Sequence, residues 1–471
     1  FSQNPPLKLP ELNPYFATDF SLNPVDKART IPQAIIKEQG KQIYTMGSRY
    51  FPNEPKASLM IAMQIVPEVI DLKLGVSAVL LGYMSDLALN KLAFQASVAG
   101  IHFSPMLTEN GIAIGINGYT QHLDKLLHNV ISQFSQFELS EDLLTQSKQR
   151  YIESLDRLEK DNALRQAATP FANFARYPYM EESKKRAMVE KITLADIEQI
   201  RQRLLTQATG LSFLSVGSLS DDQAKTLVAN VEKQIKNHNS AIDFGRYLDI
   251  SQSQRKLNFT KAIPHEDNAL IMSYFPNGYD ELQGRSLSAL LRSIVSRWYF
   301  DDLRTDKQLG YVVYATNAKV GKTYGLQFAV QSPTASPQSI MQHNERFFGE
   351  SLAKLNAMPA DEFEKYRHSL IEKLEHKPES LAQEFEEFVA DFTRGNDKFD
   401  DTAKMIEQVK QLTQQQVIDF FKKAMIDQHG FVFASQAIGT KKEINQAAAL
   451  KGFEKVESIE ELQKAFELKS Y

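Results

Sequence analysis

Two stretches of the chain repeat apolar residues at the spacing of one helix face, i, i+3, i+4, i+7, i+8 and i+11. A short apolar run of strand character, bounded by proline or glycine, precedes each stretch, at 59–66 and at 269–275. Burying one large apolar side chain stabilises a fold by about 1.5–3 kcal/mol, so we interpret both stripes as core-facing helices. The stripes are Val76, Val79, Leu80, Tyr83, Met84 and Leu87, and Leu287, Leu290, Leu291, Ile294, Val295 and Trp298.

Two further stretches have helical periodicity. The first predicts another core-facing stripe, formed by Leu123, Leu126, Leu127, Val130, Ile131 and Phe134. The second predicts an amphipathic helix whose acidic face lies in solvent, with a basic partner surface as the alternative for that face. Its apolar stripe is Phe385, Phe388, Val389 and Phe392, and its acidic residues are Glu384, Glu386, Glu387 and Asp391.

Other landmarks recur at nearly the same offset. Gly100 corresponds to Gly310, Gly111 to Gly325, and the pair Phe171 and Phe174 to the pair Phe385 and Phe388. Strand-like runs at 211–216 and 431–435 end the two halves, and Ser220-Asp221-Asp222-Gln223 is a capping-box pattern that opens a helix. Two copies at so long a period indicate a duplicated domain rather than a solenoid. We therefore predict an α+β protein with similar domains at 15–235 and 258–471, joined by a polar linker at 236–257.

Composition narrows the classes of function. The chain has 471 residues, of which 42% are hydrophobic and 24% charged, an ordinary globular balance with room for roughly two to four domains. A net charge of -4 provides no field that would attract nucleic acid or an anionic membrane. No stretch approaches the roughly 20 apolar residues of a bilayer-spanning helix, so we expect no membrane span.

Two features of the chain concern its origin. Cysteine is absent, which excludes disulfides and thiolate sites and leaves both the periplasm and the cytoplasm open. The chain starts at Phe1 without an initiator methionine, a charged start or an apolar signal core. We therefore expect a mature or excised segment of a longer protein.

The histidines do not form a recognisable metal site. None of the nine belongs to a His-Glu-x-x-His motif or to its inverse, His-x-x-Glu-His. His122 and His128 are six positions apart on a helical segment, which places them about 120° off each other's face and predicts solvated surface side chains. His265-Glu266-Asp267 precedes a strand and is expected to be an exposed turn. We predict that this chain binds no metal.

Other hydrolytic or nucleotide-binding motifs are also missing. Gly321-Lys322-Thr323 matches the end of a phosphate loop, but Thr316 stands in the place of the first glycine and a strand-like run follows. No Gly-x-Ser-x-Gly elbow occurs. The chain therefore lacks a residue set for hydrolysis by itself.

The run Leu-Arg-Thr-Asp-Lys-Gln-Leu-Gly-Tyr-Val-Val at 303–313 is followed by Gly-Leu-Gln-Phe-Ala-Val-Gln-Ser at 325–332. Together they closely resemble the C-terminal half of the pitrilysin and insulin-degrading enzyme family. Further segments that agree in order are Leu7-Lys8-Leu9-Pro10, 87–100, Val216-Gly217-Ser218-Leu219 and Lys377-Pro378. The resemblance covers nearly the whole chain, and the tail at 452–471 is more similar to bacterial pitrilysins than to animal relatives.

The resemblance implies an architecture and a cofactor. Members of the family are zinc endopeptidases with four similar α/β domains, two in each half, which enclose peptides in a chamber. This chain resembles the third and fourth domains, each a mainly antiparallel sheet packed with helices. The inverted zinc motif belongs to the first domain, so the resemblance implies that zinc is bound by an N-terminal catalytic half and not by this chain.

The resemblance also implies site residues. In the family, the arginine and tyrosine of the Arg-Thr-x-x-Gln-Leu-Gly-Tyr motif contact substrate near the zinc site, and here they match Arg304 and Tyr311. Tyr311 would donate to the oxyanion and Arg304 would clamp a substrate carbonyl, while Gln308, Leu309 and Gly310 position the turn.

A second family site is altered in this chain. Relatives bind anions at a basic cluster near the position of Lys377-Pro378. Here Glu375 and Glu379 flank the pair, which argues against anion regulation.

The leading hypothesis is a non-catalytic C-terminal half of a zinc metalloendopeptidase, which contributes substrate binding and transition-state support. Its partners would be the N-terminal catalytic half, in the same polypeptide or as a separate subunit, and peptide substrates. The alternative is a separately encoded binding or scaffold subunit that docks onto an active zinc peptidase subunit. A third possibility, unaided hydrolysis, predicts chelator-sensitive cleavage by the isolated chain, and we expect none. Resemblance to bacterial pitrilysins implies the periplasm, with the cytoplasm as the other option.

Overall fold

A computed structural model describes residues 12–66 and 71–471, and it divides into two compact units. Unit 1 comprises the described residues up to Tyr151, together with Ala187–Asp243 and Lys377–Phe399. Unit 2 comprises Ile152–Arg186, Phe244–His376 and Asp400–Tyr471. The segment Leu7-Lys8-Leu9-Pro10, which contributes to the family resemblance, lies outside the described residues.

Unit 1 is built on a six-stranded sheet with the order β1-β2-β6-β3-β5-β4. All neighbours are antiparallel except β2 and β6, which are parallel. The strands are β1 (Gln33–Glu38), β2 (Lys41–Met46), β3 (Lys56–Gln64), β4 (Ile101–Thr108), β5 (Gly111–Tyr119) and β6 (Gly210–Gly217).

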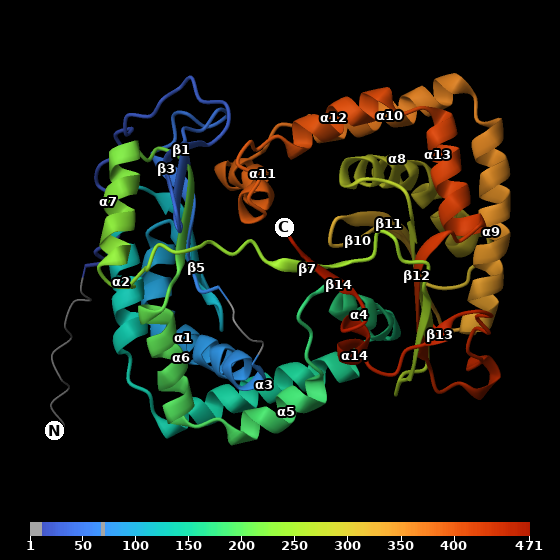
Figure 1. Ribbon diagram of the computed structural model, residues 1–471, viewed down its shortest axis with the longest axis horizontal. Coiled ribbons are helices and arrows are strands. Elements are labelled where there is room, and N and C mark those ends of the chain that lie inside the picture. The colour runs from blue at the N-terminus through green and yellow to red at the C-terminus, as the bar shows by residue number, and fades with distance from the viewer. Residues whose placement is uncertain (1–11, 67–70) are drawn as a thin grey trace, which may run out of the picture. The chain divides into compact units, whose positions relative to one another are not determined.

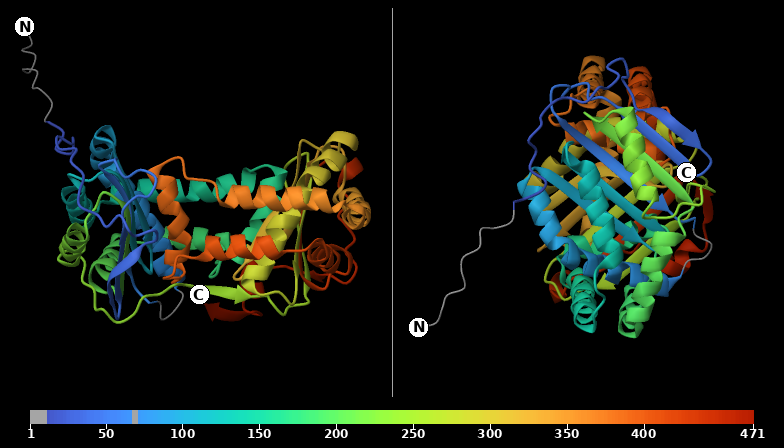
Figure 2. Two further views of the ribbon diagram at one scale, coloured as in Figure 1. Left: turned by 90° about the horizontal axis from the view of Figure 1, so that it is seen from above. Right: turned by 90° about the vertical axis from the view of Figure 1, so that its left-hand side faces the viewer.

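Helices cover both faces of this sheet. Figure 1 shows α2 and α7 on one face and α11 on the opposite face, and the right-hand view of Figure 2 shows helices lying across the strands behind them. Helix α7 begins at the capping box predicted for Ser220 and Gln223. The helices are α1 (Leu72–Val98), α2 (Leu123–Gln136), α6 (Leu194–Thr206), α7 (Asp221–Glu232) and α11 (Leu381–Thr393). Helices α3 (Glu141–Lys160) and α5 (Glu182–Lys191) have residues in both units.

Helix α1 is the one helix of the described residues that is long and apolar enough to cross a membrane by length and composition. It contacts β4, α2 and α6, and it buries ten residues, two of which are serines. These contacts explain the apolar composition of α1, which serves as a core helix of unit 1. Of its predicted stripe, Val76, Leu80 and Met84 are buried, whereas Val79 is 36% exposed because the buried face is rotated toward Ser77 and Leu81.

Unit 2 contains a second six-stranded sheet, with the order β10-β11-β9-β12-β8-β13. The pairs β12/β8 and β13/β8 are parallel and the others antiparallel. The strands are β8 (Lys256–Ala262), β9 (Asn268–Pro276), β10 (Val312–Val320), β11 (Thr323–Ser332), β12 (Gly430–Ile438) and β13 (Glu454–Lys455). Strands β7 (Arg246–Asp249) and β14 (Glu467–Ser470) form a separate antiparallel pair, so part of the stretch expected to be a linker is a strand.

One face of the unit 2 sheet packs against α8 (Glu281–Phe300), α9 (Pro337–Ala357) and α13 (Gln414–Phe421) in a large apolar cluster. Five members of the predicted α8 stripe are buried, and Trp298 is partly buried at the margin. The other face packs against α4 (Ala163–Ala175) and α14 (Ile459–Gln463). The remaining elements are α10 (Ala360–Leu374), α12 (Asp401–Gln411), the π-helices η1 (Asp301–Asp306) and η2 (Lys422–Ile426), and the 3-10 helix η3 (Lys442–Ile444).

The two sheets repeat one topology. Read from opposite edges, the strands β2, β6, β3, β5 and β4 of unit 1 correspond to β8, β12, β9, β11 and β10 of unit 2. Gly111 and Gly325 occupy matching strands, where an added Cβ would lie 2.4 Å from the carbonyl oxygen of Met63 and 1.9 Å from that of Tyr274. The α+β fold and its duplication, predicted from the recurring stripes and glycines, are therefore confirmed.

Each unit receives one helix from a part of the chain that otherwise belongs to the other unit. Helix α4 lies in sequence between segments of unit 1, but its Phe174 stacks on Phe431 and Phe433 of unit 2, with ring centroids 5.4 and 5.6 Å apart. Helix α11 lies in sequence between segments of unit 2, but Phe385 and Phe388 pack on the sheet of unit 1. The two phenylalanine pairs that match in sequence thus have matching structural roles.

The prediction of a solvated acidic face on α11 is wrong at two of its four positions. Glu386 and Glu387 are exposed, but Glu384 is 0% and Asp391 4% exposed. Glu384 accepts hydrogen bonds from the Ser48 hydroxyl, at 2.5 Å, and from the Arg49 backbone N–H, at 2.8 Å. Helical spacing does not reveal these donors, because they lie in the loop between β2 and β3, far from α11 in the sequence.

Candidate functional site

The predicted site residues lie on one continuous segment of unit 2, where α8 widens into η1 and the chain then turns into β10. Arg304, Gln308 and Tyr311 are exposed, and the Tyr311 side chain stands out at 82% exposure. Leu309 is buried and Gly310 partly buried. In this segment, exposed side chains that can contact a ligand therefore alternate with buried residues that pack in the core.

Two leucines fasten the segment to the core. Leu303 is 0% and Leu309 7% exposed, and both belong to the large apolar cluster beneath the unit 2 sheet. The Leu309 N–H donates to the Leu303 carbonyl at 3.0 Å. The buried Ser332 hydroxyl, at the end of β11, donates to the Leu309 carbonyl. These contacts fix the backbone two residues before Tyr311.

Gly310 permits a close approach between backbones. A Cβ at this position would lie 1.8 Å from the Gln331 carbonyl oxygen, so no larger residue fits without a backbone shift. Gln308 adopts a φ of 51°, the left-handed region that non-glycine residues seldom enter. The turn that presents Tyr311 is consequently shaped by its backbone and not only by side-chain packing.

An ion pair fastens the other end of the segment. The Arg346 guanidinium of α9 lies 2.8 Å from Asp302 of η1, and the Asp302 side chain is 16% exposed. Burial, and then the neighbouring Arg346, lowers the pKa of the His343 imidazole on the same helix. One turn below, the buried Tyr299 hydroxyl donates to Asn344 at 2.8 Å, and burial raises the pKa of that phenol. Helix α9 thus holds the start of the segment from below.

The Arg304 side chain is directed by an aromatic ring. Its guanidinium carbon lies 4.7 Å from the centroid of the Phe300 ring, within cation–π range. The other face of a stacked guanidinium and its N–H groups stay available for a carbonyl or carboxylate. Arg304 and Tyr311 therefore present several hydrogen-bond donors on a segment whose two ends are anchored.

Sequence reasoning did not find the anchoring residues Ser332, Arg346, Asn344 and Phe300. Ser332 is 23 positions from Leu309, and Asn344 is 45 positions from Tyr299. No periodicity or motif links residues at such separations. Two signals were available: Phe300 lies four positions before Arg304, the spacing of neighbours on a helix face, and Ser332 closes the second run of the family resemblance without an assigned role.

Possible metal ligands do not converge in the described part of the chain. Within 12–66 and 71–471, no group of three or more histidine, aspartate or glutamate side chains could hold a metal ion. His122 immediately precedes α2, where its Nε2 lies 3.2 Å from the Phe16 carbonyl oxygen, and His128 is exposed. The described residues do not fit a zinc site, and no chemical step of this chain is assigned to zinc.

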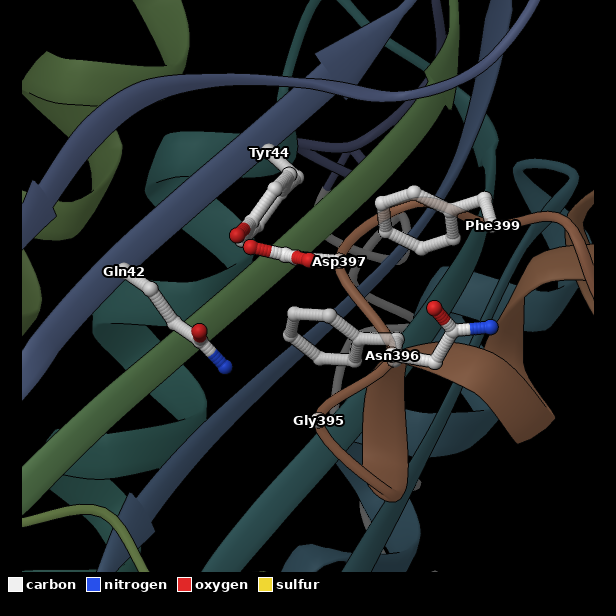
Figure 3. Close-up of a pocket in the computed structure, with 7 residues that line it drawn as sticks. Gln42, Tyr44, Gly395, Asn396, Asp397 and Phe399 are labelled. Carbon is white, nitrogen blue, oxygen red and sulfur yellow. The ribbon is translucent and has the colours of Figure 1, made fainter.

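A small cavity in unit 1 lies where the segment after α11 meets the sheet (Figure 3). The side chains of Tyr44 and Asp397 converge on it, and Asp397 pairs with Lys37. Its volume of about 10 Å³ suits about one water molecule. This cavity is too small for a peptide side chain, so it is a packing feature and not a substrate site.

Comparisons with known proteins match the chain in two parts. A model of the middle or third domain of peptidase M16 matches residues 1–188. A model described as PQQ synthase PqqF-like, C-terminal lobe domain 4, matches residues 290–389. The second match includes the whole segment from η1 to Tyr311.

Curated relatives match over most of this chain. Protease 3 of Salmonella typhi is 34% identical over 435 residues, which cover 92% of this chain and 45% of the relative. Protease 3 of Escherichia coli (strain K12) is 33% identical over 464 residues, covering 98% and 48%. The chain thus spans about half the length of the curated relatives it matches.

Solved structures agree. The crystal structure of pitrilysin matches with a TM-score of 0.94 and 33% identity, over 98% of this chain and 49% of that one. A peptidase M16 inactive domain from Pseudomonas fluorescens matches with a TM-score of 0.63 at 16% identity, over 89% of this chain and all of the other, and supports the fold alone.

Proposed function

Because this chain belongs to the M16 peptidase family, in which it corresponds to the C-terminal lobe, we propose that it is the non-catalytic half of a zinc metalloendopeptidase. Its role is to bind peptide substrates inside a chamber and to support the transition state of their cleavage. The zinc and the general base come from an N-terminal catalytic half. We also propose that the enzyme acts in the periplasm, as the resemblance to bacterial pitrilysins implies.

The exposed Tyr311 on an anchored segment carries this proposal. A phenol that is 82% exposed contributes little to core stability, whereas the backbone beneath it is held by Ser332 and by the close approach of Gly310 to Gln331. Such an arrangement suits a group that must meet a ligand in one orientation.

The chemistry of the two exposed side chains fits peptide hydrolysis. A phenol hydroxyl can donate to the oxyanion that forms when a peptide carbonyl is attacked. A guanidinium can hold a second carbonyl of the same peptide through parallel N–H donors. Because Phe300 restrains the Arg304 guanidinium, less conformational entropy is lost when substrate binds.

Tyr311→Phe in the full-length enzyme tests this role. We expect kcat to fall roughly tenfold to a thousandfold, the range for loss of one oxyanion donor, with a smaller change in KM. Steady-state kinetics on a fluorogenic peptide measure both constants. Tyr324→Phe, a tyrosine of β11 in the same unit, is the control and is expected to keep the kcat of the parent enzyme.

Two outcomes would overturn the proposal. An unchanged kcat in Tyr311→Phe would remove Tyr311 from the reaction. Chelator-sensitive cleavage by the purified 471-residue chain would show that the catalytic set lies within this polypeptide.

A further inference from the structure

Each six-stranded sheet ends in two edge strands, β1 and β4 in unit 1 and β10 and β13 in unit 2. An edge strand presents unpaired N–H and C=O groups, and soluble proteins usually block such edges with prolines, bulges, charges or short strands. An edge without these features is a template for another extended chain.

Three of the four edges carry such a block. Strand β1 has a bulge between Ala34 and Ile36 and an exposed lysine, Lys37. Strand β4 contains Pro105 near its middle, and a proline cannot donate a hydrogen bond. Strand β13 is only two residues long. None of the three suits pairing with a long partner strand.

Strand β10 has no proline and no bulge and is not short, and its one charged residue, Lys319, lies beyond residues 312–317 with its ammonium 5.1 Å from the Tyr324 ring centroid. It runs for nine residues without proline, glycine or bulge, in unbroken register with β11 from Val312↔Gln331 to Val320↔Thr323. Among the described residues, its backbone hydrogen-bonds to β11 alone. Val312, Tyr314 and Thr316 are only partly buried. Successive residues of a strand alternate in direction, so about half of the residues in β10 point both backbone groups away from β11.

The open part of the edge adjoins the candidate site. At the far end of β10 the hairpin turn is covered, because Gly321 faces the Tyr247 ring of β7 so closely that an added Cβ would lie 2.0 Å from it. The near end, residues 312–317, begins directly after Tyr311. At about 3.3 Å per residue, these six positions provide a strip of about 20 Å for an extended chain.

We propose that residues 312–317 of β10 bind peptide substrate as an added β-strand, with the Tyr311 phenol at the end of the strip. Backbone pairing supplies affinity that does not depend on side chains, and only an unfolded segment can present its backbone in this way. The substrate class is therefore extended, unstructured peptide, chosen by conformation more than by sequence. This inference rests on the proposed function, because that function supplies a peptide as the occupant of the edge.

Hydrogen exchange on the 471-residue chain tests the proposal. With a saturating unstructured peptide of about twelve residues, the outward amides of 312–317 should exchange at least severalfold more slowly, while those of β4 should not change. The control is the same peptide with the backbone nitrogens of two adjacent central residues methylated. Because neighbouring N–H groups of a strand point to opposite edges, this peptide lacks one donor whichever of its edges faces β10, and it should give no protection. Protection that is absent from 312–317, or equal for the two peptides, would overturn the proposal.

A pair of variants separates backbone pairing from folding. Of the neighbouring residues Thr316 and Asn317, one N–H points toward β11 and the other points outward. Thr316→Pro and Asn317→Pro should therefore differ. One variant should lower the Tm, and the other should keep the Tm of the parent and lose the peptide-dependent protection. Full protection in the variant of unchanged Tm would contradict the proposal.

The edge site can be separated from self-association and from the role of Tyr311. Protection of 312–317 that grows with protein concentration and without peptide would assign the edge to a second copy of this chain, and the proposal would fail. If the peptide protects β10 but Tyr311→Phe keeps its kcat, the edge site stands and the role of Tyr311 falls. If Tyr311→Phe lowers kcat but the peptide does not protect β10, the role of Tyr311 stands and the edge site is ruled out.

Discussion

At the scale of single residues, Ser332 links three backbone groups of unit 2. Its hydroxyl donates to the Leu309 carbonyl and accepts the N–H groups of Thr334, at 3.2 Å, and Ala335, at 2.8 Å. The side chain is fully buried, so water cannot replace it when it is removed. A small polar residue thereby controls the turn that presents Tyr311.

Ser332→Ala should lower the free energy of unfolding by about 1–3 kcal/mol, because it leaves buried polar groups without partners. It should also speed tryptic cleavage after Arg304 and Lys307, because the segment loses one of its anchors. Urea unfolding and timed proteolysis measure the two effects. Ser286→Ala is the control: its buried hydroxyl in α8 has no partner, so its removal should leave both measurements near those of the parent. Cleavage as slow in Ser332→Ala as in Ser286→Ala would show that Ser332 does not hold the segment.

At the scale of elements, helix α11 is fastened to the unit 1 sheet by both apolar and charged contacts. Its phenylalanines pack on Tyr44, Met46 and neighbouring strand residues. Arg49 contributes twice, since its backbone N–H donates to the buried Glu384 and its guanidinium lies 2.9 Å from Glu387. The Glu387 side chain is 36% exposed, and this partial burial is the main cause of its raised pKa, which the nearby Arg49 opposes.

Glu384→Ala should lower the free energy of unfolding of unit 1 by about 1.5–3 kcal/mol, the range for hydrogen bonds to a charged group. Glu386→Ala, on the exposed face of the same helix, should change it by no more than about 0.5 kcal/mol. Denaturant titration of both variants provides the measurement. Equal effects would mean that burial of Glu384 contributes nothing to the attachment of α11.

At the scale of the whole molecule, each unit needs a helix that lies in sequence between segments of the other unit: α11 for unit 1 and α4 for unit 2. One face of the unit 1 sheet is covered by α11, which comes from 377–399, and one face of the unit 2 sheet is covered by α4. A fragment that follows the sequence order of the predicted domains therefore leaves an apolar face of its sheet uncovered.

A fragment of residues 12–243 should bind the apolar dye ANS, because the face formed by Tyr44, Met46, Met60, Leu214 and Val216 lacks α11. Adding a peptide of residues 377–399 should reduce dye binding and raise the Tm of the fragment. The same peptide with Phe385→Ser and Phe388→Ser should do neither. If both peptides act alike, or if the fragment alone excludes the dye, the exchanged helix is not what completes unit 1.

The sequence by itself determined the local elements, the duplication and the family. Helical stripes such as Leu123 to Phe134 and the capping box at Ser220 depend on neighbouring residues, and their spacing is visible in the chain. The run at 303–313 indicated the family through residue identities alone. These features could be predicted because each is encoded within a short window.

Only the tertiary structure decided which surfaces these elements meet. Periodicity showed that α11 has an apolar face, but it did not show that this face packs on the sheet of unit 1. It also did not show that the buried Glu384 accepts a hydrogen bond from Ser48, 336 positions away. The same holds for Arg346 and Ser332 at the candidate site, and for the open edge of β10. The physical reason is that burial and hydrogen bonding are set by contacts between distant parts of the chain, whereas spacing reports only the conformation of one part.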